Sequence, residues 1–299
     1  MRSLKPSAVF LLFVFVAPPI FHAQQTSFDD VKIRFTPTNQ HLAVDKNALL
    51  VFDDGARRLV VKSGDRPLDV SYEDIHKIVL ETDHRGVDPA KFMITVGGAW
   101  APEKRKTLWF YLEYKQTDRP PESYLIRIGE KIKQQFVEKA KAVFGGKVVF
   151  PEFPEQPEAL DKEQLPEREM KFSAKQDKKN HPLPDINPDK ALVVVVCPAI
   201  NTRYVGRNPL KIHANNRVVG INTMGTYTFF DLEPGEYLLV SQAGDASGVR
   251  IRVEPGKDYY FLQTSIVGWV SAKSILSRQS KELVMYEVNG AHYSDWKRK

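Results

Sequence analysis

One loop of this chain combines residue types that could bind a partner. The segment 97–102 reads Gly-Gly-Ala-Trp-Ala-Pro and leads into Lys104, Arg105 and Lys106. A tryptophan in a glycine-rich loop beside cations can anchor a protein partner or the interface of a membrane. The alternative is that Trp100 folds back over its own domain. Trp100, Lys104, Arg105 and Lys106 are the candidate partner-contact residues, and weak peripheral membrane contact is part of this expectation.

The side chains that bind metals or transfer protons in enzymes are scattered along the chain. The seven histidines form no i, i+4 pair and no His-Glu-x-x-His motif. The segment 185–189 has the opening of a calcium loop, but Lys190 stands where that loop needs glycine. We therefore expect no enzymatic activity, no cofactor and no metal site. The alternative is a ligand-binding protein or hydrolase with a site at an inter-domain cleft, using His213, Asp245 or His292.

The net charge is too small to indicate a polyanionic partner. Lysine and arginine number 43 and aspartate and glutamate number 37, which gives a formal charge of +6. A nucleic-acid-binding domain usually concentrates positive charge on one face. We therefore expect no nucleic acid among the partners, and a protein or envelope component instead.

Residues 1–23 have the layout of a secretory signal peptide. Arg2 and Lys5 precede the apolar run 8–16, and Ala23 provides a small residue for cleavage. We expect an exported protein, periplasmic or extracellular, with an uncleaved N-terminal anchor as the alternative. Cys197 is the only cysteine, so neither an intrachain disulfide nor a lipid anchor at the cleavage site is expected.

The region 24–150 is expected to be a β domain that ends in a helix. Its short β-favouring runs are 31–35, 49–52, 59–61, 75–80, 92–96, 108–114 and 124–128. Asp53-Asp54-Gly55-Ala56 separates two of these runs and predicts a hairpin in which glycine supplies the positive φ. Ile132, Phe136, Ala140 and Val143 then form one stripe of an amphipathic helix.

The region 151–190 is expected to be a flexible linker. Only nine of its forty residues are hydrophobic, against 42% for the whole chain, while seven are proline and seventeen are charged. Such a segment cannot bury enough apolar surface to offset the entropy lost on ordering. The chain is therefore expected to hold two separate globular domains.

The region 191–290 is expected to be an antiparallel β-sandwich, followed by a charged tail at 291–299. Short strands alternate with turns at Asn215-Asn216, at 233–236 and at 254–257, where proline and glycine follow one another. The apolar run 283–288 is interpreted as a further strand. Cys197 follows four valines and is interpreted as a small core residue.

Both halves resemble known folds. The strand order and the segment 69–79, Asp-Val-Ser-Tyr-Glu-Asp-Ile-His-Lys-Ile-Val, resemble the pleckstrin-homology-like superfold over roughly 31–150. That resemblance implies a bent barrel with a C-terminal amphipathic helix. Relatives that bind inositol phosphates have basic residues in the first hairpin loop, whereas Asp53 and Asp54 stand here.

The second half resembles the bacterial family known as domain of unknown function 2846. The resemblance rests on the hairpin 210–220, on Asp-Leu-Glu-Pro-Gly at 231–235 and on Val-Glu-Pro-Gly-Lys-Asp-Tyr-Tyr at 253–260. It covers about 192–290 and implies an exported, lipoprotein-type β-sandwich without transferable catalytic residues. A non-enzymatic binding, interaction or structural role in the bacterial cell envelope is the leading hypothesis.

Overall fold

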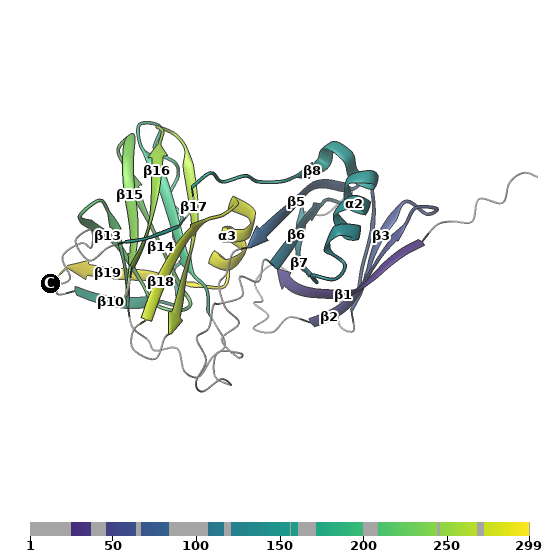
Figure 1. Ribbon diagram of the computed structural model, residues 1–299, viewed down its shortest axis with the longest axis horizontal. Coiled ribbons are helices and arrows are strands. Elements are labelled where there is room, and N and C mark those ends of the chain that lie inside the picture. Colours follow the sequence, from purple (N-terminus) through teal and green to yellow (C-terminus); the bar gives the residue numbers. More distant parts are fainter. Residues whose placement is uncertain are drawn as a thin grey trace, which may run out of the picture.

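The prediction of a mainly β protein is confirmed. A computed structural model describes residues 25–36, 46–63, 67–83, 107–116, 121–155, 157–160, 172–199, 209–243, 246–267 and 272–298. These residues form two β bodies with a short helix between them (Figure 1). The expected signal peptide 1–23 and the expected strand 92–96 lie outside the described residues. No helix in the described part of the chain has the length and apolar character needed to cross a bilayer.

The first body is an eight-stranded sheet in the order β4-β3-β2-β1-β7-β6-β5-β8. Its strands are β1 (Gln25–Thr36), β2 (Lys46–Asp53), β3 (Arg58–Lys62), β4 (Leu68–Ser71), β5 (Ile75–Asp83), β6 (Thr107–Tyr114), β7 (Glu122–Ile128) and β8 (Val148–Val149). β1 carries a bulge between Phe28 and Val31 and pairs with β2 on one side and β7 on the other. A bulge increases local bending, which lets one long strand serve both parts of the sheet.

The helix α2 (Lys133–Phe144) packs on the concave side of this sheet and completes its core. Phe136 is fully buried, and its ring lies 5.5 Å from that of Phe28 and 5.1 Å from that of Phe110. Both ring pairs have the edge-to-face geometry that aromatic quadrupoles favour. A short 3₁₀ turn, η1 (Gly145–Lys147), follows the helix.

The first hairpin differs from the expectation in one detail. β2 and β3 pair as antiparallel strands with Asp53 opposite Arg58. The positive φ of 53° belongs to Arg57 and not to Gly55. The Asp53 carboxylate accepts a hydrogen bond from the N–H of Ala56, which stabilises the first part of the turn. The residue with left-handed backbone geometry is therefore the last one of the loop.

The second body has two facing sheets. One is ordered β10-β19-β14-β11-β17-β18 and the other β13-β12-β15-β16-β9. Their strands are β9 (Glu158–Ala159), β10 (Phe172–Asp177), β11 (Ala191–Cys197), β12 (Leu210–Ala214), β13 (Arg217–Asn222), β14 (Thr226–Leu232), β15 (Gly235–Gln242), β16 (Ala246–Val253), β17 (Asp258–Val267), β18 (Ala272–Arg278) and β19 (His292–Arg298). The expectation of a purely antiparallel sandwich is wrong, because β11–β17 and β14–β19 pair in parallel. β11, which lies between the antiparallel β14 and the parallel β17, is buried along its whole length.

The region 151–190, expected to be a flexible linker, contains two short strands. β9 adds to the edge of one sheet by pairing with β16, and β10 adds to the other by pairing with β19. Glu155 forms an ion pair with Arg278 of β18. A segment with few apolar side chains can still order itself on an existing sheet edge, because the pairing uses backbone N–H and C=O groups. Residues 161–171 lie outside the described part.

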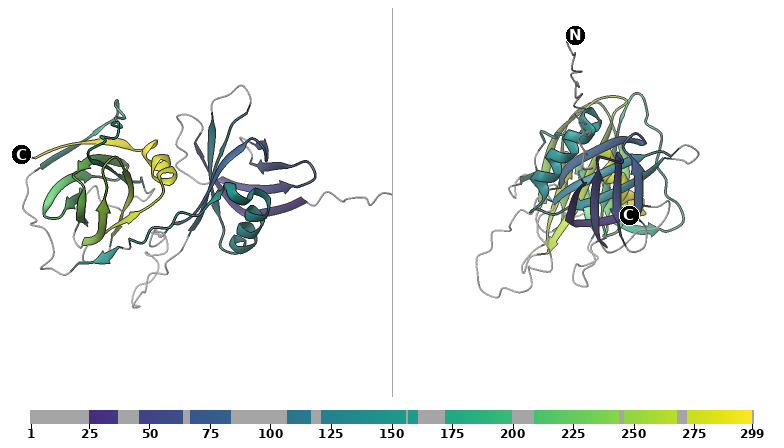
Figure 2. Two further views of the ribbon diagram at one scale, coloured as in Figure 1. Left: turned by 90° about the horizontal axis from the view of Figure 1, so that it is seen from above. Right: turned by 90° about the vertical axis from the view of Figure 1, so that its right-hand side faces the viewer.

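Two further segments of the C-terminal region differ from their sequence interpretation. The apolar run 283–288 is not a strand but belongs to the helix α3 (Lys281–Val288). The expected charged tail forms β19. A short apolar run does not distinguish a strand from a helix that is buried on two sides. Figures 1 and 2 show α3 between the two bodies, which explains why both of its faces are apolar.

Candidate functional site

The residues predicted to contact a partner lie outside the described part of the chain. This applies to Trp100, Lys104, Arg105 and Lys106, which belong to the segment that joins β5 to β6. β5 and β6 themselves pair over nearly their full length, with Asp83 opposite Thr107. Both strands contribute residues to the junction between the two bodies: Glu81 comes from β5 and Trp109 from β6.

The alternative catalytic residues are not brought together. His213 lies on β12, is 1% exposed, and its Nε2 lies 3.1 Å from Oε1 of Gln242. Burial lowers the pKa of His213 to about 4, although the Gln242 contact opposes this shift. His292 begins β19 in the other sheet, where its ring lies 6.2 Å from that of His181. Asp245 lies outside the described residues.

A chain of buried polar side chains crosses the interior of the second body. Asn222 donates to the carbonyl of Val195 and to Oε1 of Gln263, at 3.1 Å in each case. Gln263 in turn donates to Ser241, whose hydroxyl contacts that of Ser274. All four polar side chains are fully buried. Because the network is sealed and its members bond to one another, it stabilises the contact between the two sheets.

The junction between the bodies has an apolar core drawn from distant parts of the sequence. Trp109 of β6 and Leu125 of β7 are 4% and 1% exposed and turn away from the core of their own body. They share one buried cluster with Leu283 and Val284 of α3 and with Val194 of β11. The two bodies therefore pack directly against each other and are not connected by the linker alone.

A buried carboxylate of the first body holds the start of α3. Glu81 of β5 is 5% exposed and accepts hydrogen bonds from the backbone N–H of Ser280, at 2.9 Å, and from the Ser280 hydroxyl. The Ser280 hydroxyl also accepts from the N–H of Leu283, which makes Ser280 the N-cap of the helix. Negative charge at this end of a helix is favourable because the helix dipole is positive there. Lys77 of the same strand pairs with Glu282.

Partly exposed aromatic and sulfur-containing side chains surround this apolar core. We call Tyr111, Phe229, Met285 and Tyr293 the junction rim; all four pack against the same buried cluster. The rings of Phe229 and Tyr293 stack at 5.4 Å. Desolvation is the main reason that the pKa of Tyr111 rises to about 12, so its hydroxyl stays protonated at neutral pH. Aromatic and methionine side chains of this kind are common in protein interfaces.

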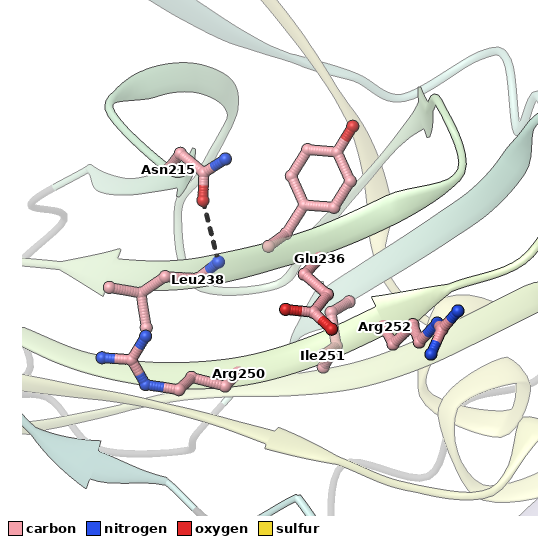
Figure 3. Close-up of a pocket in the computed structure, with 7 residues that line it drawn as sticks. Asn215, Glu236, Leu238, Arg250, Ile251 and Arg252 are labelled. Carbon is pink, nitrogen blue, oxygen red and sulfur yellow. Dashed lines mark hydrogen bonds between the residues drawn. The ribbon is translucent and has the colours of Figure 1, made fainter.

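A second candidate is a shallow basin on the outer surface of the second body, with a volume of about 440 Å³. Figure 3 shows Asn215 on one side and Glu236, Arg250 and Arg252 along β15 and β16. Glu236 stands directly opposite Arg252 in the strand register, and Leu238 stands opposite Arg250. The oxygen of Asn215 accepts from the N–H of Leu238 at 3.0 Å. Sequence reasoning missed this basin, because only strand pairing brings these residues together.

The remaining reactive group is a cysteine without access to solvent. Cys197 is free, 2% exposed, and its burial raises the pKa of the thiol to about 12. A thiol with so high a pKa forms almost no thiolate at neutral pH and is not a nucleophile. Within the described ranges, no group of three or more His, Cys, Asp or Glu side chains could hold a metal ion.

The comparisons with known proteins identify no family for this chain. No protein-family model matches it. No curated protein matches it either. The proposals below therefore rest on the geometry described above and on the sequence resemblances.

Proposed function

We propose that this chain is an exported, non-enzymatic protein of the bacterial cell envelope that binds a protein or another envelope component. The two β bodies act as one unit and offer the junction rim to that partner. The order β4-β3-β2-β1-β7-β6-β5, followed by α2, supports the pleckstrin-homology-like resemblance of the first body. The two facing sheets of the second body are compatible with the resemblance to domain of unknown function 2846.

One observation carries this proposal. Glu81 of the first body and Ser280 of the second are 199 positions apart and bond to each other in a buried environment. Together with the shared apolar cluster, this contact sets the separation of the two bodies. A partner that touches both bodies would then meet a preformed surface and would lose less conformational entropy on binding.

The hydrolase alternative is disfavoured by the environment of His213. A general base must reach the proton that it removes, directly or through one water. His213 is sealed within the second body and bonded to Gln242, and its low pKa makes it a poor base at neutral pH. The ligand-binding alternative places its site at the inter-domain cleft, whereas the basin on β15 and β16 belongs to the second body alone.

Site-specific photocrosslinking tests the proposed partner contact. A photoreactive phenylalanine replaces Phe229 on the rim, and Phe150, which is 39% exposed and lies just after β8, is replaced in the matched control. After irradiation in the source envelope, we expect a discrete crosslinked product from the Phe229 position and none from the Phe150 position. Equal products from both positions, or none from Phe229 in properly exported protein, would refute the proposal.

A further inference from the structure

The outer surface of β15 and β16 carries one cross-strand couple of opposite charges that form no ion pair with each other. Glu236 and Arg252 are cross-strand partners, an arrangement in which opposite charges commonly pair. In the described part of the chain, neither side chain forms an ion pair or a hydrogen bond. A carboxylate and a guanidinium from neighbouring strands therefore both line the basin (Figure 3).

The other two polar residues of the basin are oriented by contacts behind it. Nε of Arg250 lies 3.1 Å from a carboxylate oxygen of Glu158 on β9, which leaves its two terminal nitrogens available. The side-chain oxygen of Asn215 accepts a hydrogen bond from the N–H of Leu238, which leaves the NH₂ group of Asn215 available as a donor. The basin thus has two guanidinium groups and one amide as donors, and one carboxylate as the main acceptor.

Leu238, an apolar residue that lines the basin, packs over a glycine of the neighbouring strand. A Cβ atom at Gly248 would lie 2.7 Å from Cδ1 of Leu238 and 3.2 Å from Cδ2 of Leu160. The two leucines therefore fill the space above Gly248 on the outer surface of the sheet. Leu160 and Glu158 both come from the segment around β9, so this segment packs beside Leu238 and Arg250, two of the residues that line the basin.

We propose that this basin binds a carboxylated saccharide, such as one hexuronic acid unit of a longer glycan. A guanidinium group binds a carboxylate with two parallel hydrogen bonds. Glu236 accepts hydrogen bonds from neighbouring sugar hydroxyls, and Leu238 meets the C–H face of the ring. The volume of about 440 Å³ falls within the range of small-ligand sites.

Charge complementarity selects this ligand class over its neighbours. The two arginines favour an anion, and the Glu236 carboxylate opposes a densely charged one such as a phosphate dianion. A neutral sugar leaves the Arg252 guanidinium without a charged partner, whereas Arg250 already pairs with Glu158. This inference does not depend on the junction rim, which lies against the other sheet of the second body.

Titration with two matched trisaccharides tests the inference. Binding of trigalacturonate and of neutral galactotriose to the full-length protein is followed by calorimetry and by NMR shifts. We expect saturable binding of the acid only, weakened about tenfold or more by Arg252→Gln, which corresponds to about 1.4 kcal/mol. Glu236→Gln should weaken it less, because an amide oxygen still accepts from hydroxyls. Arg298→Gln, an exposed arginine on β19, should bind within twofold of the wild type.

Four outcomes would overturn the inference. The first is the absence of saturable binding by trigalacturonate, with the thermal unfolding of each variant unchanged. The second is equal binding of the acidic and neutral sugars. The third is equal weakening by Arg252→Gln and Arg298→Gln, which would indicate only a general effect of charge. Competition by free glycine at the same concentration would instead indicate a zwitterion site and would also count against it.

Discussion

Replacement of Ser280 by alanine should loosen the contact between the two bodies. The Ser280 hydroxyl accepts from Leu283 and donates to the buried Glu81 carboxylate. Loss of a serine N-cap costs about 0.5–2 kcal/mol. Loss of one hydrogen bond to a charged group costs about 1.5–3 kcal/mol. Because the two bonds share one atom, we expect a combined loss of about 2–4 kcal/mol in the free energy of unfolding.

Urea unfolding followed by tryptophan fluorescence measures this loss. Trp109 is 4% exposed in the junction, so its emission responds when the bodies separate. In thermal unfolding the same change should lower the midpoint by roughly 5–12 °C. Ser173→Ala is the matched control, because Ser173 is half-buried on β10 and its hydroxyl has no hydrogen bond within the described residues.

A double-mutant cycle decides whether the loss arises at the Glu81 contact. Glu81→Gln keeps the shape of the side chain and removes its charge. The effects of Glu81→Gln and Ser280→Ala should fail to add, with a coupling of about 1 kcal/mol or more, because both remove the same charged hydrogen bond. A loss below about 0.5 kcal/mol for Ser280→Ala, or strictly additive effects, would show that the bodies are held elsewhere.

Two further predictions concern packing and pH. Gly220→Ala should cost about 1–3 kcal/mol, because its Cβ would lie 2.7 Å from the fully buried side chain of Thr228. Gly129→Ala should cost less than about 0.5 kcal/mol, although its Cβ would lie only 1.8 Å from the Asp30 side chain, because that exposed side chain can rotate away. If chemical denaturation showed a larger loss for Gly129→Ala than for Gly220→Ala, it would contradict this reasoning. The folded-state pKa of His213 is depressed to about 4. The stability that its neutral side chain contributes is therefore fully present above about pH 6.5 and is lost as the pH falls toward 4. Between pH 7 and pH 4.5 the wild type should therefore lose about 2 kcal/mol more stability than His213→Gln, and equal slopes in denaturation would show that His213 titrates normally.

The mainly β fold could be predicted from the sequence where side-chain periodicity is strong. The period-two runs of the first body correspond to β1, β2, β3, β5, β6 and β7. In the helical stripe, Phe136 and Ala140 are both buried in α2. Asn215 has a positive φ of 53°, as the expected turn between β12 and β13 requires of an asparagine. Each of these signals is local, so a single sequence contains it.

The elements that sequence reasoning missed depend on non-local pairing. β9 and β10 have no apolar pattern of their own, and their order comes from the edges of β16 and β19. The helix α3 carries apolar residues on two faces because it lies between two bodies, and this makes its pattern resemble a buried strand. Its N-cap, Ser280, and the acidic Glu282 in its first turn are local signs of a helix start.

The candidate sites were even less accessible from the sequence. Glu81 and Ser280 are 199 positions apart, and no local motif connects them. Glu236 and Arg252 meet only because β15 and β16 pair in one particular register. A shift of that register by one residue would move the charged side chains to the inner surface of the sheet. The charged lining of this basin therefore depends on how the strands pair in the folded sheet, and no short sequence motif predicts it.

Because Cys197 is buried in the six-stranded sheet, its thiol can be used to measure how often this sheet opens transiently. Cys197 ends the central strand β11, with neighbours on both sides, and is almost completely shielded from solvent. A thiol reagent can modify it only during those moments when the centre of the sheet opens. The rate of labelling in the native protein thus reports the opening events that expose the end of β11, without any engineered probe.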